Sequence, residues 1–364
     1  MCFSKIKIHN FRNFTDLNFE PSSRINVIIG KNGSGKSSLI EAIGYLCKGK
    51  SFRTNHNESV IKKNGDSFSV FGSKEPDTKI GISRDFGGNL TIQIDGTHNY
   101  KLSDLAKMTP AQIIHPSDAN ILSSGGPKMR RTLIDWGTFY HKRDFYKVWQ
   151  SFSKVLKQRN SYLKQNLKYD YIKYCDIEFV RYAELIRKFR DEYLIELLPF
   201  VADLVRVFLP EYEITFGISH GWDRKKELSE VLKENYEHDR IMQCTNYGPH
   251  RADLKIKSNG ILVQDLLSRG QQKMLITAIK LAQGLFLEKI LNNNCIFLID
   301  DFASELDESK REIFSRYLSN IKGQIFITAI DIDLISSLKK DISAYFELKD
   351  NFIQRNQNDC RSTK

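Results

Sequence analysis

The alternation of apolar and polar residues predicts two N-terminal strands, followed by a glycine-rich loop and a helix. Residues 3–8 alternate as a half-buried strand does, and residues 25–29 are almost continuously apolar. A run of the second kind is typical of a strand that is buried on both faces. The glycine-rich segment 30–35 then interrupts the pattern, and residues 37–45 have helical periodicity.

Three later segments predict an antiparallel β-meander. They alternate in polarity and are separated by Gly, Asp and Asn, which are turn-forming residues. The segments are residues 68–71, 79–82 and 90–94. A strong turn signal at 123–127, Ser-Ser-Gly-Gly-Pro, marks a predicted boundary between lobes.

The periodicity becomes helical after this turn. Between residues 145 and 167 apolar residues recur at spacings of 4, 3, 4, 7 and 4, which is the pattern of a long helix with one apolar stripe. A second helical stripe covers residues 179–204, and Pro210 closes it. We therefore predict a mostly helical lobe with a short helical arm, inserted into an α/β chain.

The C-terminal third returns to alternating helices and buried strands. The predicted elements are a helix at 273–288, a strand at 295–299, a helix at 308–321 and a strand at 324–328. The predicted organisation is an N-terminal α/β part at 1–127, a helical lobe at 128–243, a C-terminal α/β part at 244–350 that completes the same lobe as the first, and a polar tail at 351–364.

Composition is that of a globular protein. The chain has 364 residues, of which 41% are hydrophobic and 27% charged, and these values exclude a mainly disordered, collagenous or membrane-embedded chain. The six cysteines are scattered without a CxxC pair, so we expect reduced thiols. The N-terminus lacks the apolar block of a signal peptide. We expect a cytoplasmic protein without a membrane partner.

The net charge of +11 is concentrated in one segment, because residues 128–168 contain eleven Lys or Arg and two acids. Such an excess suits a polyanion, nucleic acid above all, although a merely solvated basic face is the alternative. Aromatic residues alternate with these cations, and we expect most of them to pack inside the lobe. They are Trp136, Phe139, Tyr140, Phe145, Tyr146, Trp149, Phe152 and Tyr162.

The glycine loop matches the phosphate-binding pattern GxxxxGK[ST] at every fixed position. Its residues are Gly30, Lys31, Asn32, Gly33, Ser34, Gly35, Lys36 and Ser37. Backbone N–H groups in such a loop turn inward on phosphates at a helix N-terminus. Lys36 would meet the charge of the β- and γ-phosphates, and Ser37 would ligate Mg²⁺. The loop predicts an ATP site.

Two carboxylates follow the apolar strand 295–299. Asp300 at the end of a parallel strand would hold Mg²⁺, as a Walker B aspartate does. Asp301 is placed to orient or deprotonate the attacking water. With Lys36 these two residues are the candidate catalytic groups.

The segment Leu267-Ser268-Arg269-Gly270-Gln271-Gln272 is similar to the signature motif of ABC-type ATPases, and 304–307, Ser-Glu-Leu-Asp, is similar to their D-loop. In those proteins the signature of one subunit caps the nucleotide of the other, so the resemblance implies an ATP-sandwiched homodimer. The Ser268 hydroxyl and the N–H groups of Gly270 and Gln271 would form a second anion cradle. The predicted fold is an ABC-type ATPase head, with a mixed sheet and the meander.

Five segments narrow the resemblance to the RecF family of bacterial recombination mediators, which have SMC-like heads. They are residues 8–14, 51–54, 125–131, 133–135 and 248–253. The resemblance implies a weak, DNA-stimulated ATPase in gap repair and the SOS response. It implies binding to single-stranded or gapped DNA, and loading of recombinase together with RecR and RecO.

Several positions depart from the pattern or leave alternatives open. Asp301 is one methylene shorter than the glutamate that many ABC ATPases carry, so we expect slow hydrolysis. The switch histidine is absent from 328–331, and His250 is as well explained by a structural role. Gln112 is a candidate Q-loop ligand of the metal. Arg12 and Arg53 are candidate nucleotide contacts, with surface ion pairing as the alternative.

Two other functions remain as alternatives. A transporter ATPase subunit would normally carry the switch histidine and lack a basic helical insert. A nucleotide-regulated ABC-type scaffold without a DNA role would use the basic segment only as a solvated face.

Overall fold

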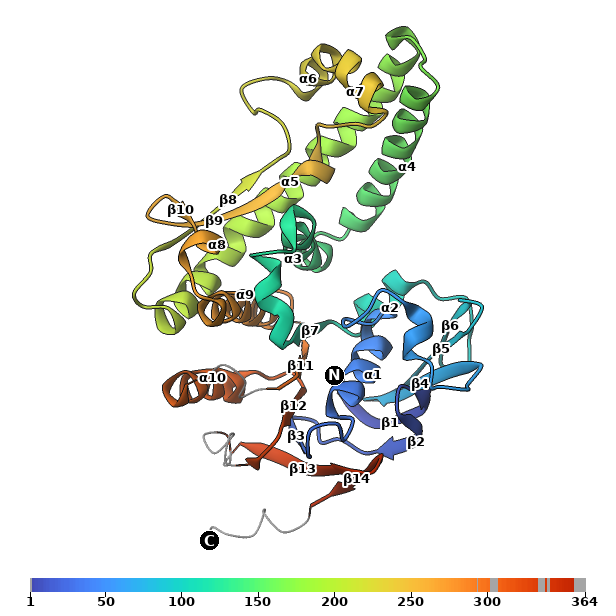
Figure 1. The fold of residues 1–364 in the computed structure, drawn as a ribbon, viewed down its shortest axis with the longest axis vertical. Helices are drawn as coiled ribbons and strands as arrows, with labels where there is room; N and C mark the ends of the chain where they lie inside the picture. The colour runs from blue at the N-terminus through green and yellow to red at the C-terminus, as the bar shows by residue number, and fades with distance from the viewer. Residues whose placement is uncertain (1, 293, 302–306, 333–337, 339–340, 357–364) are drawn as a thin grey trace. The chain divides into compact units, whose positions relative to one another are not determined.

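The computed structural model describes residues 2–292, 294–301, 307–332, 338 and 341–356. The chain divides into two compact units: residues 1–118 with 280–364 form the first, and residues 119–279 form the second. Figure 1 shows the elements of both. No helix in these ranges is both long and apolar enough to cross a bilayer.

A six-stranded, mainly parallel sheet forms the base of the first unit. Its order is β14 (Phe352–Arg355), β13 (Ile342–Lys349), β3 (Ile25–Ile29), β12 (Ile325–Ala329), β11 (Ile296–Ile299) and β7 (Ala111–Ile114). Only β14 pairs antiparallel with its neighbour. The carboxyl ends of β3, β11, β12 and β7 therefore meet at one edge, where ligands bind in open α/β sheets.

The predicted meander is part of a five-stranded antiparallel sheet in the same unit. Its order is β2 (Phe14–Phe19), β1 (Phe3–Phe11), β4 (Ser67–Lys74), β5 (Thr78–Asp85) and β6 (Leu90–Ile94). Strands β4, β5 and β6 confirm the three predicted segments. Strand β2 occupies a stretch that the pattern had left as a connector.

Helix α1 (Lys36–Lys48) packs between these two sheets (Figure 1). Nine consecutive residues, Leu39–Cys47, are buried, because side chains from both sheets surround the helix on every face. The first turn of α1 contains no acidic residue, so its N-terminal amides stay available to an anion. The unit also contains α2 (Leu102–Met108) and α10 (Glu308–Asn320).

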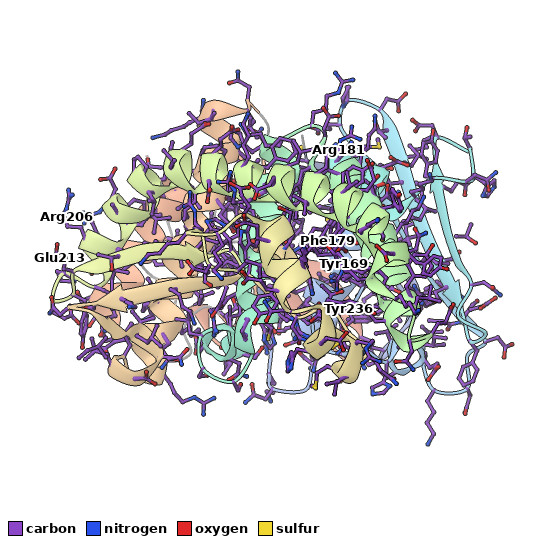
Figure 2. All side chains as sticks on the ribbon, turned by 90° about the horizontal axis from the view of Figure 1, so that it is seen from above. Tyr169, Phe179, Arg181, Arg206, Glu213 and Tyr236 are labelled. Atoms are coloured by element: carbon purple, nitrogen blue, oxygen red, sulfur yellow. The ribbon has the colours of Figure 1, made fainter. Side chains whose placement is uncertain are left out.

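A helical hairpin dominates the second unit. Helix α4 (Phe145–Lys164) and the 40-residue helix α5 (Tyr169–Phe208) pack through Phe152, Phe179 and Ile186. Near the turn of the hairpin Tyr169 lies 5.3 Å from Tyr236, measured between ring centroids (Figure 2). The eight aromatic residues of the basic segment are buried or half-buried, which confirms their packing role.

Shorter elements complete the unit. They are α3 (Gly126–His141), β8 (Ile214–Ser219), α6 (Leu228–Glu234), α7 (Tyr236–Met242), β9 (Asp253–Ser258), β10 (Ile261–Leu262) and α8 (Val263–Leu266). Helix α9 (Arg269–Ile290) begins in this unit.

Two cations of the basic segment are buried, so they add nothing to a basic surface. Arg159 is fully buried and donates to Asp176 and Asp239, each at 2.7 Å. Burial raises the pKa of Asp176, whereas the Arg159 guanidinium acts to lower it. Arg130 donates to both carboxylate oxygens of Asp253. The Arg159 pairs join α4 to α5 and α7, and the Arg130 pair joins α3 to β9.

The predicted boundaries need correction. The helical lobe was placed at 128–243, but the compact unit covers 119–279 because β8 pairs with β9, beyond the predicted limit. The predicted polar tail is wrong at its start, since residues 352–355 form β14 against β13. The five described cysteines are free thiols, as expected.

Candidate functional site: a phosphate cleft and a separate signature helix

The glycine loop closes over a cleft of about 370 Å³ at the carboxyl edge of the six-stranded sheet. A Cβ on Gly30 would lie 2.5 Å from the Leu348 carbonyl oxygen, and Gly35 has a φ of 104°. Both positions therefore require glycine. The Ser34 hydroxyl is buried and has no hydrogen-bond partner in the described part of the chain. Ser34 is not among the residues that line the cleft.

Lys36 lies inside the loop. Its Nζ donates to the carbonyl oxygens of Gly30 at 2.5 Å and Lys31 at 2.9 Å. Burial lowers the pKa of Lys36, while the carboxylates of Asp300 and Asp301 act to raise it. The two backbone carbonyls thus hold the Lys36 ammonium inside the loop, where the motif predicts that the β- and γ-phosphates bind.

Asp300 connects the loop to the acidic strand end. The Ser37 hydroxyl donates to Oδ1 of Asp300 at 3.0 Å, although the two residues are 263 positions apart in sequence. The Thr328 hydroxyl donates to the same oxygen at 2.8 Å and accepts the Asp301 N–H at 2.8 Å. The structure therefore brings Ser37, Asp300 and Asp301 together, as the motifs predicted. It adds Thr328, at the start of the segment where the switch histidine is missing.

His115 was missed by the sequence analysis because strand β7 was not predicted. Its Nε2 lies 3.5 Å from Oδ2 of Asp300. The Ser117 backbone N–H donates to Nδ1, so the proton of the neutral ring is on Nε2 and faces the carboxylate. Burial lowers the pKa of His115, against the raising effect of Asp300 and Asp118. The pattern of a short apolar segment before His-Pro was the available signal.

The two candidate arginines share one buried acid. Arg12 donates to both oxygens of Glu41, at 2.9 and 2.7 Å, and Arg53 reaches Glu41 at 3.3 Å. Ser51 also donates to Glu41. Arg53 lines the phosphate cleft, but Arg12 does not. Arg12 stays a predicted nucleotide contact. In this structure its guanidinium is engaged by Glu41 and by the Ser59 carbonyl, as the ion-pairing alternative expects.

Gln112, the predicted metal ligand, lies away from the phosphate cleft in this structure. Gln112 lies within β7, is buried, and donates through Nε2 to Oε1 of Gln283 at 2.8 Å. Alternation along the strand turns its side chain toward α9 rather than toward the cleft. It is absent from the cleft lining.

The signature residues form a capping box at the start of α9. The Gln271 N–H donates to the Ser268 hydroxyl at 3.3 Å, and Oε1 of Gln271 accepts the Ser268 N–H at 2.9 Å. Nε2 of Gln271 also donates to the Tyr212 hydroxyl at 3.2 Å. Ser268 is exposed and Gly270 half-buried, so this helix end is accessible to a ligand.

The other singled-out residues lie apart from the phosphate cleft. His250 is half-buried beside Phe152 and Phe179 and bonds the Thr245 carbonyl oxygen at 2.9 Å. Desolvation lowers its pKa to about 4. His250 is structural. Residues 304–306 of the predicted D-loop lie outside the described residues.

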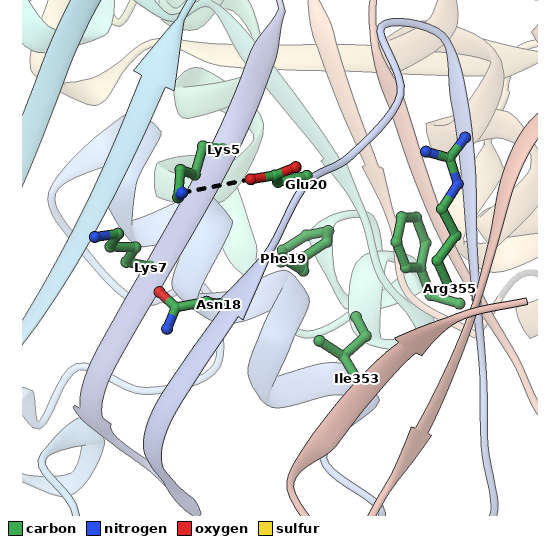
Figure 3. A pocket seen from close by; sticks show the side chains of 8 residues that line it. Lys5, Lys7, Asn18, Phe19, Glu20, Ile353 and Arg355 are labelled. Atoms are coloured by element: carbon green, nitrogen blue, oxygen red, sulfur yellow. Dashed lines mark ion pairs between the residues drawn. The ribbon is translucent and has the colours of Figure 1, made fainter.

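Another hollow in the first unit, of about 470 Å³, lies between β1, β2, β13 and β14 (Figure 3). Lys5, Lys7 and Arg355 line it, and Lys5 forms an ion pair with Glu20 at 3.4 Å. It holds none of the predicted site residues, although it is larger than the phosphate cleft.

The cleft offers oxygen ligands to a divalent cation. Within the described ranges no group of three or more His, Cys, Asp or Glu could hold a metal by itself. The Ser37 hydroxyl and the Asp300 carboxylate nevertheless lie within 3.0 Å of each other. Mg²⁺ is typically bound by one or two protein oxygens plus water and phosphate oxygens. This donor set fits Mg²⁺ in the presence of a phosphate ligand.

Comparison with known proteins gives consistent matches along the chain. The family model described as "RecF/RecN/SMC N terminal domain" matches residues 2–351. The protein named "DNA replication and repair protein RecF" from Klebsiella pneumoniae is 38% identical over 352 residues, covering 96% of this chain and 98% of that protein. Its namesake from Glaesserella parasuis is 39% identical over 360 residues, covering 97% and 99%.

Comparison with solved structures agrees with these sequence matches. The recombination mediator protein RecF with ATP has a TM-score of 0.86 at 25% identity, covering 98% of this chain and 97% of that chain. An Smc head bound to a winged-helix domain of ScpA has a TM-score of 0.59 at 14% identity, covering 98% and 97%, and shares the fold alone.

Proposed function

The chain belongs to the RecF family of DNA replication and repair proteins, and from this premise we propose that it is an ATP-dependent DNA-binding protein of recombinational repair. The chain has the fold of an ABC-type ATPase head of this family. The contact between Ser37 and Asp300 carries the proposal, because it assembles a phosphate loop and an acidic strand end into one cleft. The transporter and DNA-free scaffold alternatives are not favoured by these matches.

ATP is the proposed ligand of the cleft. The loop N–H groups and Lys36 would bind its phosphates. Ser37 and Asp300 would hold Mg²⁺, which neutralises phosphate charge when bound. His115 and Thr328 hold the Asp300 carboxylate from two sides.

Hydrolysis is proposed to be slow. Asp301 has a φ of 54°, and its backbone N–H donates to the Thr328 hydroxyl. The backbone of Asp301 is therefore held in place, and its short side chain can move the carboxylate only a little. Such a carboxylate reaches an attacking water less well than a glutamate would. We expect a turnover below about 10 s⁻¹, the median for enzymes. Phosphate release at saturating ATP measures it, and a faster rate would contradict this role of Asp301.

The ATP site is proposed to be completed by a second copy of the chain. The Ser268 hydroxyl and the first amides of α9 form an exposed anion cradle in the second unit. As the family resemblance implies, a second copy of the chain would supply this cradle in trans. In an ATP-sandwiched homodimer this cradle would bind the γ-phosphate of the other subunit.

Replacing Ser268 by alanine is expected to leave ATP binding within about twofold and to weaken ATP-driven dimerisation by at least about 30-fold, because a charge-assisted hydrogen bond is lost. Light scattering with a non-hydrolysable analogue measures the dimer. The variant Ser268→Asn keeps a helix cap without the hydroxyl and should also fail to dimerise. A wild-type chain that stays monomeric with analogue and gapped duplex would refute the sandwich.

DNA is the proposed macromolecular partner, in single-stranded or gapped form, with RecR and RecO as protein partners in loading recombinase. The pathway name carried by the RecF structure supports these partners. Filter binding of gapped duplex with and without ATP tests the DNA role, since a scaffold without one would retain no DNA in either condition.

A further inference from the structure

We propose that one face of helix α4 binds the phosphodiester backbone of DNA, an inference that rests on the proposed function. The lysine face consists of Lys147, Lys154, Lys157 and Lys164, all exposed. At 100° per residue these positions fall within an arc of about 100°, and they extend over about 26 Å of helix. They therefore form a straight line of charge on one side of the hairpin.

Within α4 no acid offsets this charge, and the nearest acid in sequence is Asp144, the N-cap of the helix. Helix α4 contains no Asp or Glu, and none of the four lysines has an ion-pair partner among the described residues. Arg143 and Lys168, which are also exposed, extend the charge beyond the two helix ends. Unpaired cations in a row are electrostatically unfavourable in the free protein, and a polyanion removes the repulsion.

Helix α5 provides an internal comparison. Its exposed cations are paired along the helix: Lys173 with Asp170 at 3.0 Å, Arg181 with Glu178 at 3.3 Å, Lys188 with Glu192 at 3.9 Å and Arg206 with Asp203 at 3.9 Å. Figure 2 shows Arg181 and Arg206 on the outside of α5. Two adjacent helices of one unit thus carry similar numbers of surface cations, but only those of α4 are free.

The residues between the lysines are suited to phosphate rather than to lipid or base edges. Gln150 and Gln158 are exposed and donate to the hydroxyls of Tyr146 and Tyr162, so the face also carries amides. Amide, hydroxyl and lysine side chains typically contact the phosphates and sugars of DNA, and such contacts position the DNA without reading its sequence. A membrane-surface helix buries its apolar face in lipid, whereas the apolar face of α4 packs against α5.

The test compares two variants that each remove four positive charges from the second unit. One carries Lys→Gln at 147, 154, 157 and 164. The matched control carries Lys173→Gln, Arg181→Gln, Lys188→Gln and Arg206→Gln. Anisotropy with a fluorescent gapped duplex and ATP measures affinity between 50 and 200 mM salt. Glutamine is a good helix former, so both helices should persist, and circular dichroism checks this.

We expect the α4 variant to bind on the order of 100-fold more weakly, with a log–log salt slope reduced by about 3.6, since each phosphate contact contributes about 0.9. The α5 control should stay within about threefold of wild type. A Lys→Arg set at the four α4 positions should restore binding.

The outcomes separate the two proposals. A wild-type chain that binds no DNA overturns the proposed function and this surface with it. A wild-type chain that binds while the α4 variant binds equally well overturns the lysine face alone. Equal losses in the α4 and α5 variants would show that net charge, not this surface, is responsible, and would also overturn it.

Discussion

Replacing Lys36 by alanine is expected to abolish ATP binding in the micromolar range, raising Kd by at least about 100-fold. The ammonium is half-buried, and the carbonyl oxygens of Gly30 and Lys31 hold it within the loop. A charge-assisted contact in such a place is worth about 1.5–3 kcal/mol, and Lys36 would make more than one with the phosphates. Isothermal titration calorimetry with ATP and Mg²⁺ measures the loss.

The control is Lys50→Ala, which removes an exposed lysine just beyond α1 and should bind ATP as the wild type does. A Lys36→Ala protein that retains Kd within tenfold would show that the loop amides alone hold the nucleotide, and the role given to Lys36 would be wrong.

Asp300→Asn should separate binding from chemistry. The amide keeps the size of the carboxylate and can still bond Ser37 and Thr328, so the fold of the cleft should persist. It loses the negative charge that a Mg²⁺ ligand needs at this position. We expect ATP affinity to change by less than about tenfold and phosphate release to fall by at least about 100-fold, the scale on which removal of one electrostatic group acts.

Phosphate-release assays over a Mg²⁺ titration measure this effect, with Asp66→Asn, at an exposed position of the same unit, as the matched control. Hydrolysis at the wild-type rate in the Asp300→Asn protein would mean that the metal is held elsewhere.

The phosphate cleft could be predicted from the sequence because local pattern determines it. A buried strand followed by glycines and Lys-Ser leaves little conformational choice, and the acids after residue 299 follow directly from an apolar run. His115 was missed, because β7 has only four residues and the place of His115 in the site depends on the pairing of β7 with β11. The hydrogen bond of Gln112 could not be predicted for a similar reason, since its partner Gln283 is 171 positions away.

The basic segment shows a second limit. Counting charges along the chain treats Arg130 and Arg159 like the lysines of α4, whereas the structure buries both against acids distant in sequence. Sequence alone cannot distinguish a cation that stabilises the core from one that faces solvent, because the distinction depends on where Asp239 and Asp253 fold.

The burial of α1 on all sides determines which part of the site can move when ATP binds. Side chains contact the helix from both sheets, and its interior residues Leu39–Cys47 are buried without a break. Close-packed interiors yield little to local force, so the helix has no room to tilt or slide when phosphate arrives. Nucleotide binding must therefore be signalled by the loop residues that line the cleft. Helix α1, which follows the loop, keeps its position through the ATP cycle.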